Sequence, residues 1–147
     1  MSRLKLLGLQ HPINYKEQDY EEAIKKLSDD KGVDAVFEML GGEHVEKSVR
    51  CLADFGRVIT YGAATGKPAH LDPRVLYART ASVHGLWLSQ LSKNTEVMAN
   101  AWNDLSRWVS DGKLHPAVGH VLPLERHDEA YRLLSEGKNY GKVVMTV

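Results

Sequence analysis

The chain has 147 residues, of which 43% are hydrophobic and 26% charged, and its formal net charge at pH 7 is zero. These values are typical of a globular domain with a buried core, and they give no electrostatic support for binding to nucleic acid or to an anionic membrane. No apolar run approaches the roughly 20 residues of a membrane-spanning helix, and the N-terminus makes a poor signal peptide. A cytoplasmic location, with no membrane or nucleic-acid partner, is the simplest expectation.

Hydrophobic periodicity and turn residues predict helices and strands in alternation along the chain. In chain order, we expect the end of a helix at 2–9, an extended strand at 11–15, a helix at 20–28, a strand at 33–37, a helix at 43–53, a strand at 57–61, a helical turn at 74–79, a strand at 81–88, a helix at 93–111, a strand at 117–122, a helix that ends at Gly137, and a last strand at 141–147.

The stretch from Lys31 to Gly66 is the clearest of these patterns. Two apolar segments that suit strands flank a helix with one apolar face, and Phe55-Gly56 is the expected end of that helix. Such a crossover forces parallel pairing of the two strands. The fold class is therefore α/β, with a parallel sheet flanked by helices and a C-terminal strand–helix–strand.

Ligands of parallel sheets bind beyond the C-terminal ends of the strands. Here those ends are Met39–Gly42 and Tyr61–Ala64. The segment Gly62–Lys67 resembles a P-loop, but it is one residue short and has Pro68 at the Ser/Thr position, so a ligand-facing turn at the strand end or a plain turn is favoured. Glu38 fits the position of a ribose-binding acid, but a strand-end carboxylate in solvent is favoured because no glycine fingerprint precedes it.

For the cysteine, the histidines and the tryptophans of the long helix, a structural role is favoured over a binding or catalytic role. Cys51, the one cysteine of the sequence, is expected to be a buried helix residue. His115 and His120 do not have the spacing of a helical metal site, so solvent-exposed or structural histidines are favoured. Core packing, rather than a stacking site, is favoured for the apolar side chains at helical spacing in the long helix, which include Trp102, Leu105 and Trp108.

The order and spacing of short segments along nearly the whole chain resemble the C-terminal half of medium-chain dehydrogenases/reductases, especially the quinone-oxidoreductase-like members of the zinc-binding dehydrogenases. The matching segments are His11–Tyr15, Gly32–Phe37, Leu40–Gly42, Phe55–Val58, Tyr61–Gly62, Ser82–Gly85, Asp111–Leu114, Leu122–Glu125, Glu129–Ala130 and Gly141–Val144.

This resemblance implies binding of NADP(H) or NAD(H) across the strand ends, weakly in this chain alone. Small residues would let the backbone approach the cofactor, and backbone groups would hold its carboxamide. Ala63 stands where relatives often carry a polar side chain. The cofactor-binding positions implied are Tyr15, Leu40, Gly41, Tyr61, Gly62, Ala63, Ala64, Leu86, Trp87, Asn139 and Lys142, with no catalytic residue and no metal ligand, zinc included.

The chain departs from the family at its N-terminal side. The G-x-G-x-x-G unit is absent, as is the N-terminal substrate domain. We therefore expect residues 1–147 to form a single partial Rossmann-like nucleotide-binding domain with a C-terminal extension, which keeps the equivalents of strands 3 to 6 of the order 3-2-1-4-5-6. The strand near Ile13 would then lack its neighbour. The opening helix fragment fits a chain cut from, or begun inside, a longer protein.

Three functions compete at this point. The first is the cofactor-domain portion of an NAD(P)H-dependent quinone-oxidoreductase-like enzyme, not catalytically competent alone. The second is a non-catalytic binding or assembly module, completed by self-association or by an N-terminal-half partner chain. The third is a methyltransferase-like fold, which Val33–Val36 and Ala53–Val58 mimic. By resemblance to dimeric relatives, we expect a homo-oligomer that pairs through the strand edge at Ala81–Leu88.

Overall fold

The computed structural model describes residues 2–147, which form two compact units. The first unit ends at Lys93 and the second runs from Asn94 to Val147. The elements of the first unit are α1 (Ser2–Leu6), α2 (Tyr20–Leu27), β1 (Val33–Glu38), α3 (Glu43–Arg50), β2 (Leu52–Thr60), α4 (Arg74–Tyr77), β3 (Ser82–Gly85) and α5 (Leu88–Leu91). Those of the second are α6 (Thr95–Ser110), β4 (Val118–Pro123), the 3-10 turn η1 (Leu124–Arg126), α7 (His127–Ser135) and β5 (Lys142–Thr146).

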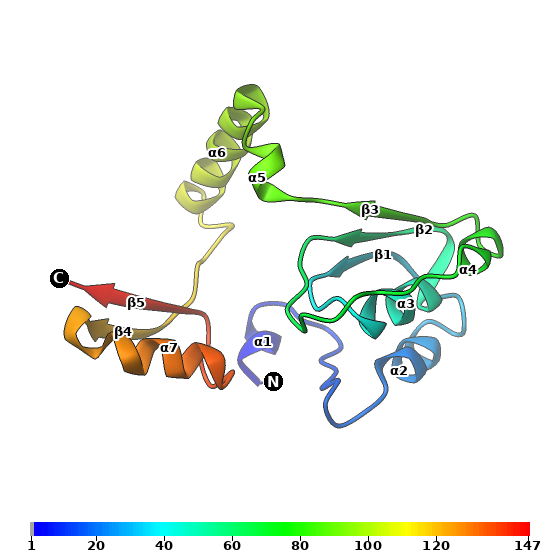
Figure 1. The fold of residues 1–147 in the computed structure, drawn as a ribbon, viewed down its shortest axis with the longest axis horizontal. Helices are drawn as coiled ribbons and strands as arrows, with labels where there is room; N and C mark the ends of the chain where they lie inside the picture. Colours follow the sequence, from blue (N-terminus) through cyan, green and yellow to red (C-terminus); the bar gives the residue numbers. More distant parts are fainter. Residues whose placement is uncertain (1) are drawn as a thin grey trace. The chain divides into compact units, whose positions relative to one another are not determined.

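The first unit is built on a parallel three-stranded sheet in the order β1-β2-β3 (Figure 1). The predicted parallel strand–helix–strand unit is thereby confirmed. In the register, Val36 lies beside Val58, and Val58 beside Val83. Val58 and Val83 pack in the core with Val49 of α3, so this row of β-branched side chains faces the covering helix. The next row places Phe37 beside Ile59 on the opposite face, and Phe37 is 73% exposed.

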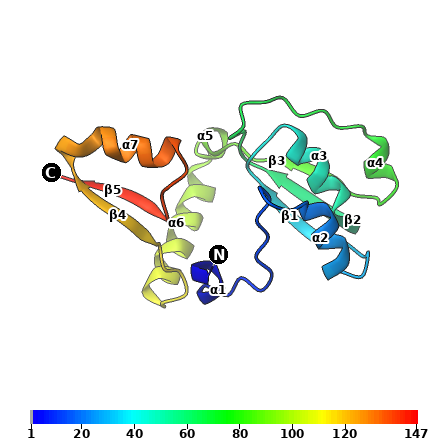
Figure 2. The same cartoon turned by 90° about the horizontal axis from the view of Figure 1, so that it is seen from below.

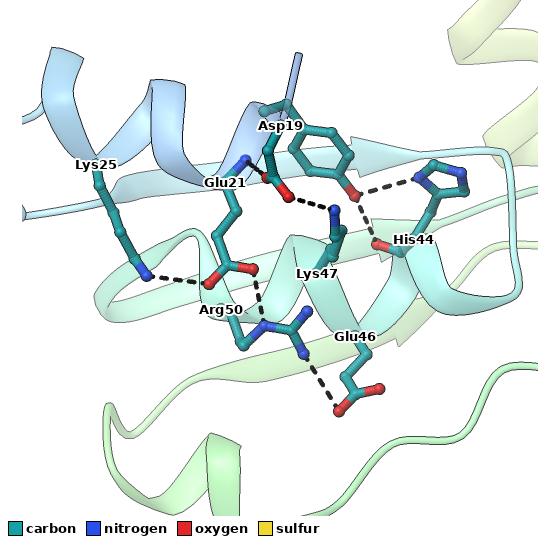
Figure 3. A network of polar contacts seen from close by, with 8 residues as sticks. Asp19, Glu21, Lys25, His44, Glu46, Lys47 and Arg50 are labelled. Atoms are coloured by element: carbon teal, nitrogen blue, oxygen red, sulfur yellow. Dashed lines mark hydrogen bonds and ion pairs between the residues drawn. The ribbon is translucent and has the colours of Figure 1, made fainter. Parts of the chain in front are cut away.

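Helices α3 and α2 form successive layers on one face of this sheet (Figures 1 and 2). Asp19 is the N-cap of α2 and accepts a hydrogen bond from the amide of Glu21, which confirms the predicted start of that helix. Figure 3 shows how the two helices are joined by charged side chains. Two ion pairs link the helices, Lys47–Asp19 at 2.7 Å and Arg50–Glu21 at 2.9 Å. Two more lie within a helix, Lys25–Glu21 at 3.1 Å in α2 and Arg50–Glu46 at 3.2 Å in α3.

Glu21 is the carboxylate at the centre of these pairs, and its titration is expected to make stability depend on pH. Partial burial raises the pKa of Glu21, but hydrogen bonds from Arg50 and Lys25 lower it by more, so the net pKa lies below the ordinary value of 4.5. Because the folded-state pKa is the lower one, the stabilisation is present above pH 4.5 and is lost as the pH falls through the folded-state value.

Glu21→Gln is therefore expected to lower the free energy of unfolding at neutral pH by on the order of 1 kcal/mol. The difference from the unmodified protein should shrink at an acidic pH below the folded-state pKa of Glu21, where both carry a neutral side chain. Urea denaturation at the two pH values measures this. Glu22→Gln, an exposed position on the same helix, is the control and should change little. An equal loss at both pH values would contradict the role assigned to the Glu21 charge.

The predicted boundary between α3 and β2 is wrong. The helix ends at Arg50 rather than at Ala53, and β2 begins at Leu52. The cause is tertiary: Val33 donates its amide to the carbonyl of Cys51 and pairs with Leu52, and the register then skips to Ala35–Arg57. The residues between form a bulge in which Phe55 has a positive φ of 62°.

Cys51 is buried as expected, at the C-cap of α3, where burial raises the pKa of its thiol to about 11.

The strand expected at His11–Tyr15 is not formed. The chain there makes turns, with the amides of Glu17 and Gln18 both donating to the carbonyl of Asn14. Pro12 has no N–H to give to a ladder, and β1 pairs only with β2 among the described residues.

The strand expected at 81–88 is also shorter, because Leu86 and Trp87 lie outside β3 and Leu88 begins α5. No helix among residues 2–147 combines the length and apolar character that crossing a bilayer requires.

The second unit contains the parallel pair β4–β5, with α7 packed against both strands. Leu122 of β4 and Ala130 of α7 are its buried apolar side chains among the described residues. The long helix α6 begins with an Asn94 cap and buries none of its side chains. The expectation that Trp102, Leu105 and Trp108 pack in a core is therefore wrong, since they are 64%, 38% and 41% exposed.

Candidate functional site

Two turns meet at the C-terminal edge of the sheet, because parallel pairing brings the ends of β1 and β2 to the same side. One turn is Met39–Gly42 and the other is Tyr61–Gly66. The backbone joins them, with amide-to-carbonyl hydrogen bonds Tyr61–Glu38 at 3.0 Å, Ala64–Met39 at 3.1 Å and Thr65–Leu40 at 2.8 Å. Six of the predicted positions are thus brought together: Leu40, Gly41, Tyr61, Gly62, Ala63 and Ala64.

Glycines allow this close approach. A Cβ at Gly62 would lie 2.8 Å from the carbonyl oxygen of Met39, closer than side chains tolerate. Gly41 has a φ of 75°, and a Cβ there would lie 3.0 Å from the Cα of Ala63. The two turns therefore pack backbone against backbone, and the contact excludes larger residues at both glycines.

The second turn retains backbone donors for a ligand. The amides of Ala64, Thr65 and Gly66 donate within the two turns. By contrast, in the described part of the chain no hydrogen bond uses the amides of Gly62 and Ala63. No helix follows this segment until α4 at Arg74. The P-loop interpretation is therefore wrong, since a phosphate-binding loop leads directly into a helix.

The expectation that the Glu38 carboxylate lies in solvent is wrong. Its side chain is only 4% exposed rather than in solvent. Oε1 accepts hydrogen bonds from the amides of Leu40 at 2.6 Å and Gly41 at 2.9 Å, and Oε2 accepts one from the Thr60 hydroxyl at 3.3 Å. The carboxylate thus lies beneath the first turn. The sequence feature that points to this burial is the position of Glu38 directly before Met-Leu-Gly-Gly, a segment whose amides need acceptors.

A largely apolar groove of about 540 Å³ leads from the first turn towards Tyr15. The Tyr15 ring meets the His44 ring edge-on, with 5.8 Å between centroids, and the Tyr20 ring stacks on the His44 ring at 5.9 Å. The Tyr20 hydroxyl lies 3.3 Å from His44 Nδ1, and burial raises the pKa of Tyr20 to about 12, so the hydroxyl stays protonated at neutral pH. Tyr15 and Leu40, both predicted site residues, line this one groove.

Among the remaining predicted positions, Leu86 follows β3 and lies at the same C-terminal edge of the sheet as the two turns. Leu86 donates its amide to the carbonyl of Thr60 at 2.9 Å, which attaches it to the end of β2. Trp87 follows as the N-cap of α5 and is 68% exposed. Asn139 and Lys142 belong to the second unit, where the Asn139 side chain donates to the carbonyl of Gly141.

Comparison with known proteins decides the family. The model of the family described as zinc-binding dehydrogenase matches residues 7–145. The chain belongs to the zinc-binding dehydrogenase family. The resemblance to medium-chain dehydrogenases/reductases is thereby confirmed, and the methyltransferase-like alternative is wrong. The members of this family are dehydrogenases and reductases that use a nicotinamide cofactor.

Curated relatives extend well beyond this chain. It is 34% identical to the synaptic vesicle membrane protein VAT-1 homolog of Rattus norvegicus, over 97% of the chain and 39% of that protein. It is 29% identical to quinone oxidoreductase-like protein 2 of Bos taurus, over 95% of the chain and 40% of that protein. The chain thus spans about 40% of the length of the curated relatives it matches.

Solved structures give the same result for the fold. The JamJ enoyl reductase superposes with a TM-score of 0.83 at 28% identity, over 99% of this chain and 44% of the other. An NAD-dependent alcohol dehydrogenase superposes with a TM-score of 0.80 at 33% identity, over 99% of this chain and 40% of the other. The α/β fold class with helix-flanked parallel sheets is confirmed.

The family description raises the question of zinc. Within residues 2–147, no group of three or more His, Cys, Asp or Glu side chains lies close enough to hold a metal ion. Cys51, at the C-cap of α3, is buried and its thiol pKa is raised, whereas zinc requires the thiolate. The described residues therefore do not fit a zinc site.

Proposed function

We propose that this chain is the cofactor-binding portion of an NAD(P)H-dependent, quinone-oxidoreductase-like enzyme. The observation that carries the proposal is the pair of turns at the sheet edge, which places the unused amides of Gly62 and Ala63 beside the Met39–Gly42 turn. Family membership supports a nicotinamide nucleotide as the ligand.

The residues at this edge suit such a ligand. The amides of Gly62 and Ala63 would donate to the carboxamide oxygen of the nicotinamide, because no side chain at Ala63 competes for it. Leu40 and Gly41 would lie along a ribose, and the aromatic groove at Tyr15 would take the adenosine end. When bound, the nicotinamide supplies or accepts a hydride. The chain's own residues bind and orient the ring, and we propose no catalytic residue among them.

Nucleotide titration tests this proposal. Calorimetry with NADPH and NADH up to millimolar concentrations should show binding that Gly62→Ala weakens by at least about tenfold, since the new Cβ must displace the turn that carries the donors. Gly85→Ala is the matched control, because a Cβ there meets nothing within 4 Å. An absence of heat with both nucleotides would exclude cofactor binding by this chain, and equal affinities for the two variants would exclude this turn as the site.

A non-catalytic assembly module is the second candidate. β1 and β3 are the outer strands of the sheet, so each offers one backbone edge without a strand neighbour among the described residues. Pairing through the edge at Ala81–Leu88 in a homo-oligomer, or completion by an N-terminal-half partner chain, stays a prediction. Exposed strand edges are the physical reason for it, because unpaired backbone groups favour addition of another strand. This candidate gains support if the titration shows no binding.

A further inference from the structure

Glu38 is a buried carboxylate whose hydrogen bonds all serve the candidate site. It ends β1 and lies opposite Thr60 in the strand register. Its two oxygens accept from two amides of its own turn and from the Thr60 hydroxyl of the neighbouring strand. None of the ion pairs in the described part of the chain includes it.

Burial of a carboxylate is unfavourable unless donors replace its water, and here three donors do so. The Leu40 and Gly41 amides are therefore held by short, charge-assisted hydrogen bonds. The turn they belong to is otherwise pliable, because Gly41 and Gly42 both have positive φ, at 75° and 58°. The hydrogen bonds to the Glu38 carboxylate therefore hold this turn in one conformation, although Gly41 and Gly42 would allow several.

We propose that Glu38 is a positioning residue for the nucleotide site. It fixes the Met39–Gly42 turn against the Tyr61–Gly66 turn, and it occupies the Leu40 and Gly41 amides so that they do not bind an anion. This turn then accepts an uncharged part of the ligand, such as a sugar, rather than a phosphate, because a buried negative charge lies directly behind it. The inference rests on the proposed function only in its identification of the ligand.

Hydrogen exchange measured by NMR tests the positioning role without any ligand. In Glu38→Ala, the exchange protection of the Leu40 and Gly41 amides should fall by at least about tenfold, while that of the core amide of Val58 stays within a factor of about two. Glu38→Gln keeps one acceptor oxygen of the same reach, so it should restore most of the protection. Glu17→Ala, an exposed glutamate of the same unit, is the control and should leave all three amides unchanged.

NADPH titration of the same variants tests the link to binding. Affinity should fall by at least about tenfold in Glu38→Ala and recover to within about threefold in Glu38→Gln. If Glu38→Ala does not fold, Glu38→Asp replaces it: the shorter side chain should lose protection at one of the two amides. Unchanged protection in Glu38→Ala or Glu38→Asp would overturn the proposal. If the unmodified chain binds no nucleotide, the proposed function fails, while the exchange result still decides whether Glu38 positions the turn.

Discussion

Leu52→Ala is expected to lower the free energy of unfolding of the first unit by about 3 kcal/mol. Leu52 has no exposed surface and forms the buried cluster of this unit with Val49 and Val58. It also pairs with Val33 at the start of β2, so β1, β2 and α3 all contribute residues that surround Leu52. Truncation leaves a cavity that the paired backbone around it cannot close.

Urea denaturation followed by circular dichroism measures this loss, and hydrogen exchange at β1 and β2 amides assigns it to the first unit. Leu6→Ala is the matched control, because Leu6 is 87% exposed and its truncation removes little buried area. The control should change the free energy of unfolding by less than about 0.5 kcal/mol. Equal effects of the two substitutions would show that the cluster around Leu52 is not the core.

Gly119→Ala is expected to separate the strands of the second unit. A Cβ at this position would lie 1.6 Å from the carbonyl oxygen of Tyr140, which is backbone and cannot rotate away. Gly119 lies at the register shift between Val118 and His120, where β4 passes the residues that lead into β5. We expect a loss of about 3 kcal/mol or more, the upper part of the range for overpacked sites.

Amide exchange at Val144 of β5, which lies beside Val121 of β4, provides the measurement. The Val144 amide should lose protection in Gly119→Ala, while the amides of β1 and β2 keep theirs. Gly85→Ala makes the same chemical change where a Cβ meets nothing within 4 Å, and it should leave both sheets intact. Retained protection at Val144 in Gly119→Ala would contradict the close contact.

Local patterns predicted the elements of this chain well where side-chain chemistry alone decides them. The helical pattern at 20–28, the apolar run at Val33–Phe37 and the apolar face of α3 are local properties, and each element formed. The errors lie where a distant backbone group decides the outcome. β2 starts early because the amide of Val33 reaches the carbonyl of Cys51. The strand near Ile13 does not form because a strand requires a neighbour, whatever its own propensity.

The candidate site divides in the same way. The two turns could be located from the sequence, since parallel strands leave their C-terminal ends at one edge and glycines mark the turns. The burial of Glu38 was not predicted, because a charged residue at a strand end is usually in solvent. Its burial follows from the two amides above it and the Thr60 hydroxyl beside it, and these three donors meet only after β1 and β2 have paired.

The sequence by itself determined the α/β class, the strand–helix–strand unit and the place of the two turns, because periodicity and glycine positions are local properties of the chain. The tertiary structure alone decided the start of β2, the exposure of the tryptophans of α6, the amides left unused at Gly62 and Ala63, and the burial of Glu38. Each of these depends on which backbone donor meets which acceptor across the fold, and that pairing is a property of the assembled sheet.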